Sequence, residues 1–167
     1  MTSLSAISLL LMLAAFGASA SPPPGDEDTC SLPELTSLPA WFRAAAPLPG
    51  RLRPSCRLNP FFHRVDLDGD DRVDLALQVV DTTSGAAGIT LVQRADLALT
   101  VLGAGEEFGN GGDDFAWLDG WSVLEADDPA LDGLDFCGEA LLLVKWEAAS
   151  AFVGWTGDGH VWVQAGD

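Results

Sequence analysis

The sequence predicts a mainly β domain, in which an antiparallel meander sheet carries a short N-terminal helix and a D-x-D-G-D loop. Several segments alternate apolar and polar residues with the period of two that is typical of strands. The clearest is 72–81, where one face carries Val73, Leu75, Leu77 and Val79. Short turns rich in glycine and hydroxyl side chains separate such segments, so we expect consecutive strands to pair antiparallel in one sheet.

Residues 1–20 have the features of a signal peptide. A largely apolar run over 7–16 precedes Ala18-Ser19-Ala20, which is a small-x-small cleavage site. The run is shorter than the roughly 20 residues that a bilayer span requires, and no later apolar stretch reaches that length. We therefore expect export to the periplasm or the cell exterior, with no membrane insertion after cleavage.

The next segment, 21–29, is rich in proline, aspartate and glutamate and is predicted to be a disordered linker. A single mainly β domain then covers 30–167. Ser31 and Ser37 both resemble helix N-caps followed by an early proline, and we expect one helix at 38–46. Four prolines between Pro47 and Pro60 predict mostly irregular chain there.

The remaining strands follow in order. They are predicted at 61–65, 72–81, 89–94, 97–102, 140–146, 150–155 and 160–164. A tight turn at 156–159 joins the last two strands, and an acidic loop is expected at 125–135. The segment 115–124 carries two of the six tryptophans, most of which are expected in the core.

The stretch from Asp66 to Asp74 reads D-L-D-G-D-D-R-V-D and is the most informative part of the chain. Ca²⁺ binds six to eight oxygens, and a peptide loop supplies them when alternate residues point inward. Position 7 could offer the backbone carbonyl of Arg72, and Gly69 permits a sharp turn. The predicted metal ligands, at positions 1, 3, 5 and 9 of the loop, are Asp66, Asp68, Asp70 and Asp74.

The residues around this loop predict strands on both sides, unlike the helices of an EF-hand. Position 6 is Asp71 where an EF-hand has glycine, and position 12 is Leu77 where it has glutamate. Without a cation, carboxylates this close would repel one another. The alternative to a Ca²⁺ site is a solvated acidic hairpin turn with Asp-Gly at its corner.

The strand–loop–strand pattern resembles the calcium loop of FG-GAP and VCBS repeats, D-x-D/N-G-D-G-x-x-D followed by a hydrophobic residue, over about 61–80. The resemblance implies that Asp66, Asp68, Asp70 and Asp74 are the ligands, with Asp71 where the family has glycine. The motif occurs once, which argues against a full propeller. A tryptophan-rich second half also resembles a group of small exported bacterial proteins, which implies no activity.

Cys30, Cys56 and Cys137 are the three cysteines. In an exported protein a disulfide is plausible, and Cys30–Cys56 would tie the N-terminal segment to the start of the sheet. Cys137 would then be a buried thiol or form an intermolecular bond. The cysteine and histidine spacing matches no zinc site.

The net charge of −17 disfavours nucleic acid and anionic membranes as partners and suits cations or basic partners. Little in the sequence points to catalysis: there is no G-x-S-x-G motif, and His63, His160 and Glu147 are each expected to be ordinary strand or strand-end residues. The glycine-rich loop 103–114 lacks phosphate-binding spacing and is expected to be a mobile surface loop. A weaker cation site or a lip over a binding surface is the alternative.

These observations predict an exported Ca²⁺-binding β domain that acts as a binding or structural module without catalysis. Its partner would be an unidentified protein or glycan. Two alternatives stay open. An acidic inhibitor or immunity-type protein would bind a basic partner through its charge. A secreted carbohydrate-active hydrolase would need two carboxylates facing each other in a tryptophan-lined cleft.

Overall fold

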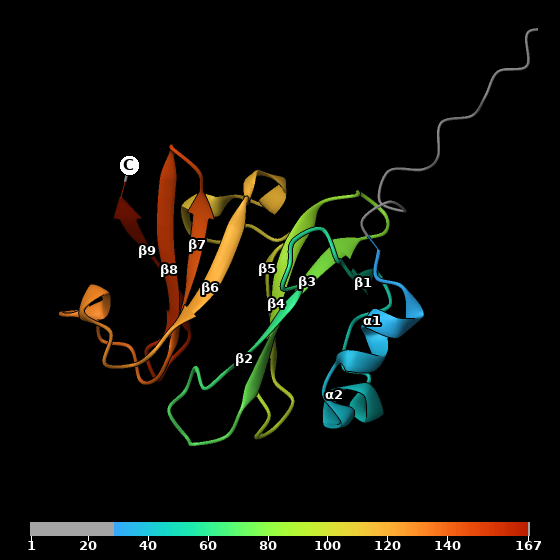
Figure 1. Cartoon of the computed structure of the whole chain (residues 1–167), viewed down its shortest axis with the longest axis horizontal. Helices are drawn as coiled ribbons and strands as arrows, with labels where there is room; N and C mark the ends of the chain where they lie inside the picture. The colour runs from blue at the N-terminus through green and yellow to red at the C-terminus, as the bar shows by residue number, and fades with distance from the viewer. Residues whose placement is uncertain (1–28, 167) are drawn as a thin grey trace, which may run out of the picture.

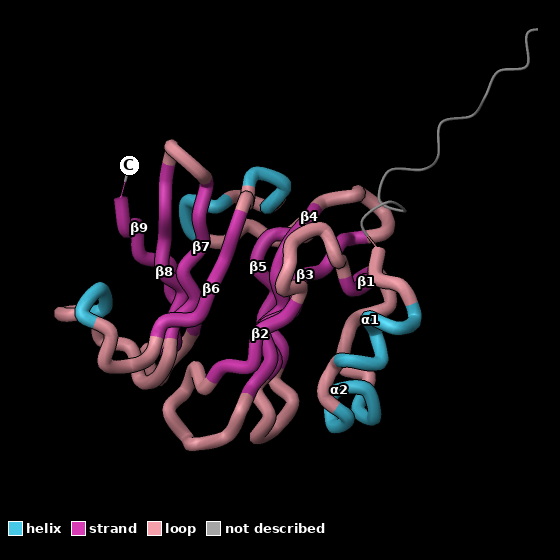
Figure 2. The backbone as a smooth tube through the Cα atoms, in the orientation of Figure 1, coloured by secondary structure: helices cyan, strands magenta, loops and turns pink. Residues whose placement is uncertain are grey.

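The computed structural model describes residues 29–166 as three layers (Figure 1). Two short helices cover the outer face of a five-stranded antiparallel sheet, and a four-stranded antiparallel sheet packs against its other face (Figure 2). The mainly β, antiparallel prediction is confirmed. The predicted signal peptide and residues 21–28 of the predicted linker lie outside the described residues, whereas Thr29 forms an isolated antiparallel bridge with Ser55.

The first sheet is built around β3 (Asp74–Asp81). Two short strands, β2 (Phe62–Val65) and β1 (Leu52–Pro54), pair with consecutive parts of one edge of β3. Its other edge pairs with β4 (Ala87–Val92), which pairs in turn with β5 (Leu99–Gly103). All eight residues of β3 are buried because both faces of this sheet are covered.

The second sheet is a meander of β6 (Gly120–Leu124), β7 (Ala140–Lys145), β8 (Ala149–Trp155) and β9 (His160–Gly166). The expectation of one sheet was therefore wrong. The meander divides after β5, where the 103–114 segment carries the chain to the second sheet. Alternation along a strand shows that one face is buried, and it does not show which sheet the strand joins.

Two apolar cores separate the three layers. Between the sheets, Val65, Ala76, Ile89 and Leu91 meet side chains of the second sheet that include Leu141 and Val153. On the opposite face, Leu75, Leu77 and Val79 of β3 pack beneath Leu38 and Phe42. The predicted face of Leu75, Leu77 and Val79 is thus correct, whereas Val73 is 42% exposed at the end of the acidic loop.

The helix expected at 38–46 is present as α2 (Ala40–Ala45), and a second helix, α1 (Leu32–Ser37), follows the N-cap signal at Ser31. At the start of α1, the backbone N–H of Ser31 donates to Glu34 Oε2 at 2.7 Å, as in a capping box. Pro39 separates the helices because a residue before proline is disfavoured in the helical region, and Leu38 is extended (φ −59°, ψ 148°). The chain over 47–60 is mostly irregular, as predicted, and its one strand is β1, an edge strand that ends on Pro54.

Short 3-10 helices occupy the long connections: η1 (Gly109–Gly111), η2 (Phe115–Trp117) and η3 (Pro129–Leu131). A disulfide joins Cys30, just before α1, to Cys56, just after β1. This is the pair that the sequence analysis placed first. Cys137 is an exposed free cysteine, so the expectation of a buried thiol was wrong. It lies in a connection, 132–139, that follows η3 and leads into β7.

Candidate metal centre

The acidic loop is the hairpin connection between β2 and β3. Val65 pairs with Asp74 in the strand register, so the two ends of the loop are held side by side. The strand–loop–strand arrangement follows from the sequence on either side, where β2 and the fully buried β3 both pack into the core. This hairpin fixes the first and last of the predicted ligands on neighbouring strand ends.

The loop is folded around the carboxylate of Asp66. Three successive backbone N–H groups donate to it: Gly69 at 2.9 Å and Asp70 at 3.2 Å to Oδ1, and Asp71 at 3.0 Å to Oδ2. Two residues adopt left-handed conformations to allow this turn, Gly69 at φ +71° and Asp71 at φ +63°. Aspartate is among the few non-glycine residues that adopt this conformation readily, which accounts for Asp71 at a turn position that favours glycine.

Three of the four predicted ligands come together. Asp66, Asp68 and Asp74 each place a carboxylate oxygen so that the three atoms lie within 4.8 Å of one another. Ca²⁺–oxygen distances are about 2.3–2.6 Å, so oxygens on opposite sides of one ion are about 5 Å apart. The spacing of these oxygens therefore fits the coordination sphere of a single Ca²⁺ ion.

The fourth predicted ligand, Asp70, is not part of this group. Its Oδ1 accepts a hydrogen bond from the backbone N–H of Arg72 at 2.8 Å, and its Oδ2 lies 3.7 Å from the Arg72 guanidinium. An aspartate whose carboxylate accepts from the backbone two residues ahead forms a local Asx turn. The sequence spacing could not distinguish this local role from a ligand role.

Asp74 is the buried member of the group. The residue is 1% exposed, and Oδ1 accepts the backbone N–H of Arg94 at 2.7 Å. The other oxygen, Oδ2, is buried with no hydrogen-bond partner among residues 29–166. Burial raises the pKa of Asp74 to about 6, and the nearby carboxylates of Asp68 and Asp70 add to the shift. A buried carboxylate oxygen without a partner is costly, and a cation at this point would remove that cost.

Asp68 occupies a similar but more open position. Its Oδ2 accepts a hydrogen bond from the Gln93 side chain at 3.3 Å, and its Oδ1 accepts the backbone N–H of Asp70 at 3.2 Å. Burial raises the pKa of Asp68, and repulsion from Asp70 and Asp66 contributes to the shift. Both shifts have the sign that a positive ion would reverse.

The loop also contacts the second sheet through residues 137–139, just before β7. Glu139 and Asp66 make a reciprocal pair of hydrogen bonds: the backbone N–H of Asp66 donates to Glu139 Oε2 at 2.7 Å, and the backbone N–H of Glu139 donates to the Asp66 carbonyl at 2.8 Å. A Cβ on Gly69 would lie 2.4 Å from the Cys137 carbonyl oxygen, and one on Gly138 would lie 2.2 Å from the Asp66 carbonyl oxygen. The backbones are therefore in close contact across this seam.

Sequence reasoning missed Glu139. It lies 73 residues after Asp66, in a segment with no metal-binding spacing of its own. The one local signal was Gly138, since a glycine beside a strand can mark a close backbone approach. A single sequence does not say which backbone it approaches.

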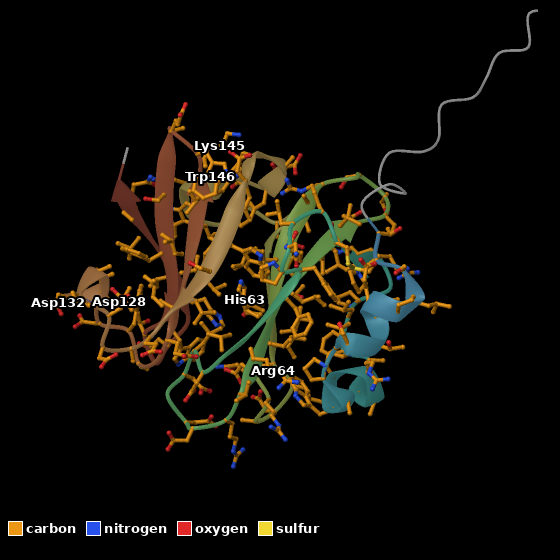
Figure 3. The ribbon with its side chains drawn as sticks, in the orientation of Figure 1. His63, Arg64, Asp128, Asp132, Lys145 and Trp146 are labelled. Carbon is orange, nitrogen blue, oxygen red and sulfur yellow. A yellow bond between two sulfur atoms is a disulfide. The ribbon has the colours of Figure 1, made fainter. Side chains whose placement is uncertain are left out.

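The other candidate residues have structural surroundings. His63 lies on β2 (Figure 3). Its ring packs edge-on against Trp121 at 4.5 Å between ring centroids, and burial lowers its pKa. His160 packs against Trp155 at 4.8 Å, and its Nδ1 lies 3.1 Å from Thr100 Oγ1 on β5 of the first sheet. Glu147 is exposed in the turn between β7 and β8 at φ +58°. Both histidines are strand residues, as expected, and the Nε2 atom of each is buried with no hydrogen-bond partner among residues 29–166.

The glycine-rich segment 103–114 is largely exposed, as expected of a surface loop, and it also contacts the rest of the protein at several points. Gly109 and Gly111 lie against the indole of Trp162, and Asp114 Oδ1 accepts the backbone N–H groups of Ala87 and Ala116, both at 2.9 Å. Glu106 forms an ion pair with Arg51 at 2.7 Å. Two of the carboxylates that suggested a second cation site thus already have protein partners.

A scan against protein-family models, a search of curated proteins and a search of solved structures each found no match to this chain.

Proposed function

We propose that the chain is an exported Ca²⁺-binding β domain that serves as a binding or structural module, without catalysis. The observation that carries the proposal is Asp74 Oδ2, a buried carboxylate oxygen without a hydrogen-bond partner in the described chain, grouped with oxygens of Asp66 and Asp68. A cation is the partner that this group lacks. Ligands that are all oxygen atoms favour Ca²⁺ over the softer transition metals.

Asp66, Asp68 and Asp74 would hold the ion directly, and the Arg72 carbonyl remains a further proposed ligand. The ion would supply positive charge between carboxylates that otherwise repel one another. Because the loop contacts Glu139, binding would also strengthen the connection between the two sheets, beyond the two strands that flank the loop. In this reading the cation is a structural element of the domain.

The wider role follows from charge and export. A net charge of −17 disfavours nucleic acid and anionic membranes, so the partner is a protein or a glycan outside the cytoplasm. No helix within residues 29–166 is long and apolar enough to cross a membrane.

The test is thermal unfolding, followed by tryptophan fluorescence in EDTA and in about 10 mM Ca²⁺. Extracellular sites commonly have Kd values of about 0.1–1 mM. A hundredfold excess over Kd stabilises the fold by about 2.7 kcal/mol, which raises the Tm of a domain this size by roughly 5–10 °C. Ca²⁺ is expected to raise the Tm by the same amount in a protein that lacks the predicted signal peptide, residues 1–20.

Asp68→Asn is the informative variant, because Asp68 contributes an oxygen to the group while Asp66 also holds the loop together. Asp71→Asn is its matched control: it removes the same charge from the same loop, at an exposed residue outside the group. We expect Ca²⁺ to stabilise the wild type and Asp71→Asn, and to stabilise Asp68→Asn much less. Equal melting of the wild type in EDTA and Ca²⁺ would overturn the proposal.

A further inference from the structure

A hollow lies away from the acidic loop, at one end of the four-stranded sheet. It has a volume of about 210 Å³ and a mainly apolar lining. Pockets for drug-sized ligands are about 300–1,000 Å³, so this one suits a single ring. The larger and polar side chains of its lining come from η1, η2 and strands β7 to β9. They are Asn110, Trp117, Lys145, Ser150, Trp162 and Gln164.

Two tryptophans form the apolar walls. The indoles of Trp117 and Trp162 are 6.1 Å apart between centroids and 75° apart in plane, so together they make a corner. The Trp117 N–H donates to the Gly111 carbonyl at 2.9 Å, which satisfies its polar atom. Gly109 and Gly111 allow the backbone of η1 to lie directly on Trp162. The walls are thus fixed before any ligand arrives, which lowers the entropy cost of binding.

Polar groups lie on the rim of the same hollow. The Gln164 amide nitrogen donates to the carbonyls of Ser150 at 3.0 Å and Gly166 at 3.1 Å, which orients the side chain. Asn110 is exposed beside it. Lys145, at the end of β7 (Figure 3), is the only lysine in the chain, and its ammonium pairs with Asp119 at 2.9 Å. Both N–H groups of the Gln164 amide are thus used, and its Oε1, which accepts the Trp162 N–H at 3.4 Å, keeps a lone pair that can accept a hydrogen bond from a ligand hydroxyl.

Charge narrows the class of ligand. Anions are repelled by a chain of net charge −17 in which Asp119 already neutralises the lysine of the pocket. Cations find no carboxylate in the lining of this hollow, in which the only charged side chain is the paired Lys145. The remaining class is neutral, with an apolar face for the indoles and a polar edge for the amides. A pyranose ring has this form: its C–H groups are attracted to the negative face of an aromatic ring, and its hydroxyls point outward.

An adjoining hollow extends the site. It has a volume of about 360 Å³, shares Lys145, Ala149 and Ser150 with the first, and is also lined by Glu147. Two hollows that share lining residues are close enough to take neighbouring units of a chain of sugars.

We propose that the Trp117–Trp162 pocket binds one hexose unit of a neutral glycan, with the next unit in the adjoining hollow. The proposal names a ligand class for the binding module and rests on different residues from the cation site.

The test uses the full chain after residue 20, in Ca²⁺. The probes are the methyl glycosides of glucose, galactose, mannose and N-acetylglucosamine, with neutral disaccharides of each. Tryptophan fluorescence gives the Kd, and saturation-transfer NMR shows which sugar protons contact the protein. At least one probe is expected to bind saturably, with transfer strongest to the C–H protons of one ring face, and the disaccharide is expected to bind more tightly.

Trp162→Ala is expected to weaken binding at least about tenfold, which corresponds to about 1.4 kcal/mol. Trp162→Ala also removes packing against η1, so a second variant is needed. Ala149 is a partly exposed residue of the lining, and Ala149→Leu should abolish binding because the larger side chain fills the hollow. The matched control is Trp146→Ala, which removes a tryptophan that is 63% exposed and outside the lining, and it should bind as the wild type does.

The proposal fails if none of the sugars binds, if indole binds and the sugars do not, or if Trp162→Ala and Ala149→Leu both bind like the wild type. None of these results depends on whether Ca²⁺ raises the Tm, so failure here and failure of the cation site are distinguishable.

Discussion

At the scale of single residues, Asp74 is the most consequential side chain in the chain. It begins β3, at a position that is 1% exposed, and one of its two oxygens has no hydrogen-bond partner within 29–166. An ionised carboxylate in such a place destabilises the fold unless a positive charge faces it. If the proposed cation site is correct, Asp74 lowers stability without a cation and raises the affinity for one, so we expect its replacement to have opposite effects in the two conditions.

Asp74→Asn tests this pair of effects. In EDTA at neutral pH the variant is expected to be more stable than the wild type by about 1–3 kcal/mol, because a buried charge has been removed at nearly constant shape. Adding Ca²⁺ should increase the free energy of unfolding of this variant very little. Urea unfolding in both buffers measures the two effects, with Asp71→Asn as the equal-charge control. A variant that is less stable in EDTA and still responds to Ca²⁺ would contradict the assignment of Asp74.

His160 predicts a pH dependence of stability. Burial lowers its pKa from 6.5 to about 4, so the folded protein holds the ring neutral where the unfolded chain would bind a proton. The stability that depends on a neutral His160 is complete above pH 6.5 and is lost as the pH falls from 6.5 towards 4, by at most about 3 kcal/mol. Histidine proton NMR should show a titration near pH 4 that is absent in His160→Asn. A titration near 6.5 would show that the ring is not buried.

At the scale of elements, the contact between the acidic loop and residues 137–139 connects the proposed cation site to the second sheet. It consists of two short hydrogen bonds between Asp66 and Glu139 and of glycines at both closest approaches. A loop fixed on one side by its hairpin and on the other by Glu139 has few alternative conformations, so its carboxylates stay grouped. The site is thus pre-formed by contacts that lie far from it in the sequence.

Gly138→Ala should weaken this seam. The added Cβ would lie 2.2 Å from the Asp66 carbonyl oxygen, so one backbone must move, at a cost of about 1–3 kcal/mol. Both the Tm and its increase in Ca²⁺ are expected to fall. Gly50→Ala is the control, since a Cβ there has no atom within 4 Å, and its effect should be within about 0.5 kcal/mol. Equal melting of the two variants would show that the seam does not hold the loop.

At the scale of the whole molecule, three layers are held together by two apolar cores and one covalent link. The Cys30–Cys56 disulfide closes a sequence separation of 26 residues and joins the helical layer to β1. It should stabilise the fold mainly by restricting the unfolded chain.

Replacing both cysteines with serine is expected to lower the free energy of unfolding by about 3–4 kcal/mol. Chemical unfolding of the oxidised protein, with Cys137→Ser as the control, measures this difference. The control should unfold like the wild type, because Cys137 is exposed and unpaired. A loss of the same size in Cys137→Ser would show that the third cysteine has a structural role.

Local chemistry determined much of what the sequence could predict. The acidic hairpin, the strands on either side of it and the antiparallel class all follow from side-chain alternation and turn residues within short windows. The left-handed conformations of Asp71 and Gly69 are local in the same sense, because they depend on the conformational preferences of single aspartate and glycine residues.

Only the tertiary structure decided how these pieces combine. It divided the strands between two sheets, placed Asp70 outside the ligand group, buried one oxygen of Asp74 and brought Glu139 to the loop across 73 residues. Each of these depends on which surfaces face one another after folding. A pattern of period two fixes the buried face of a strand, and the element that covers this face is selected by packing across the whole chain.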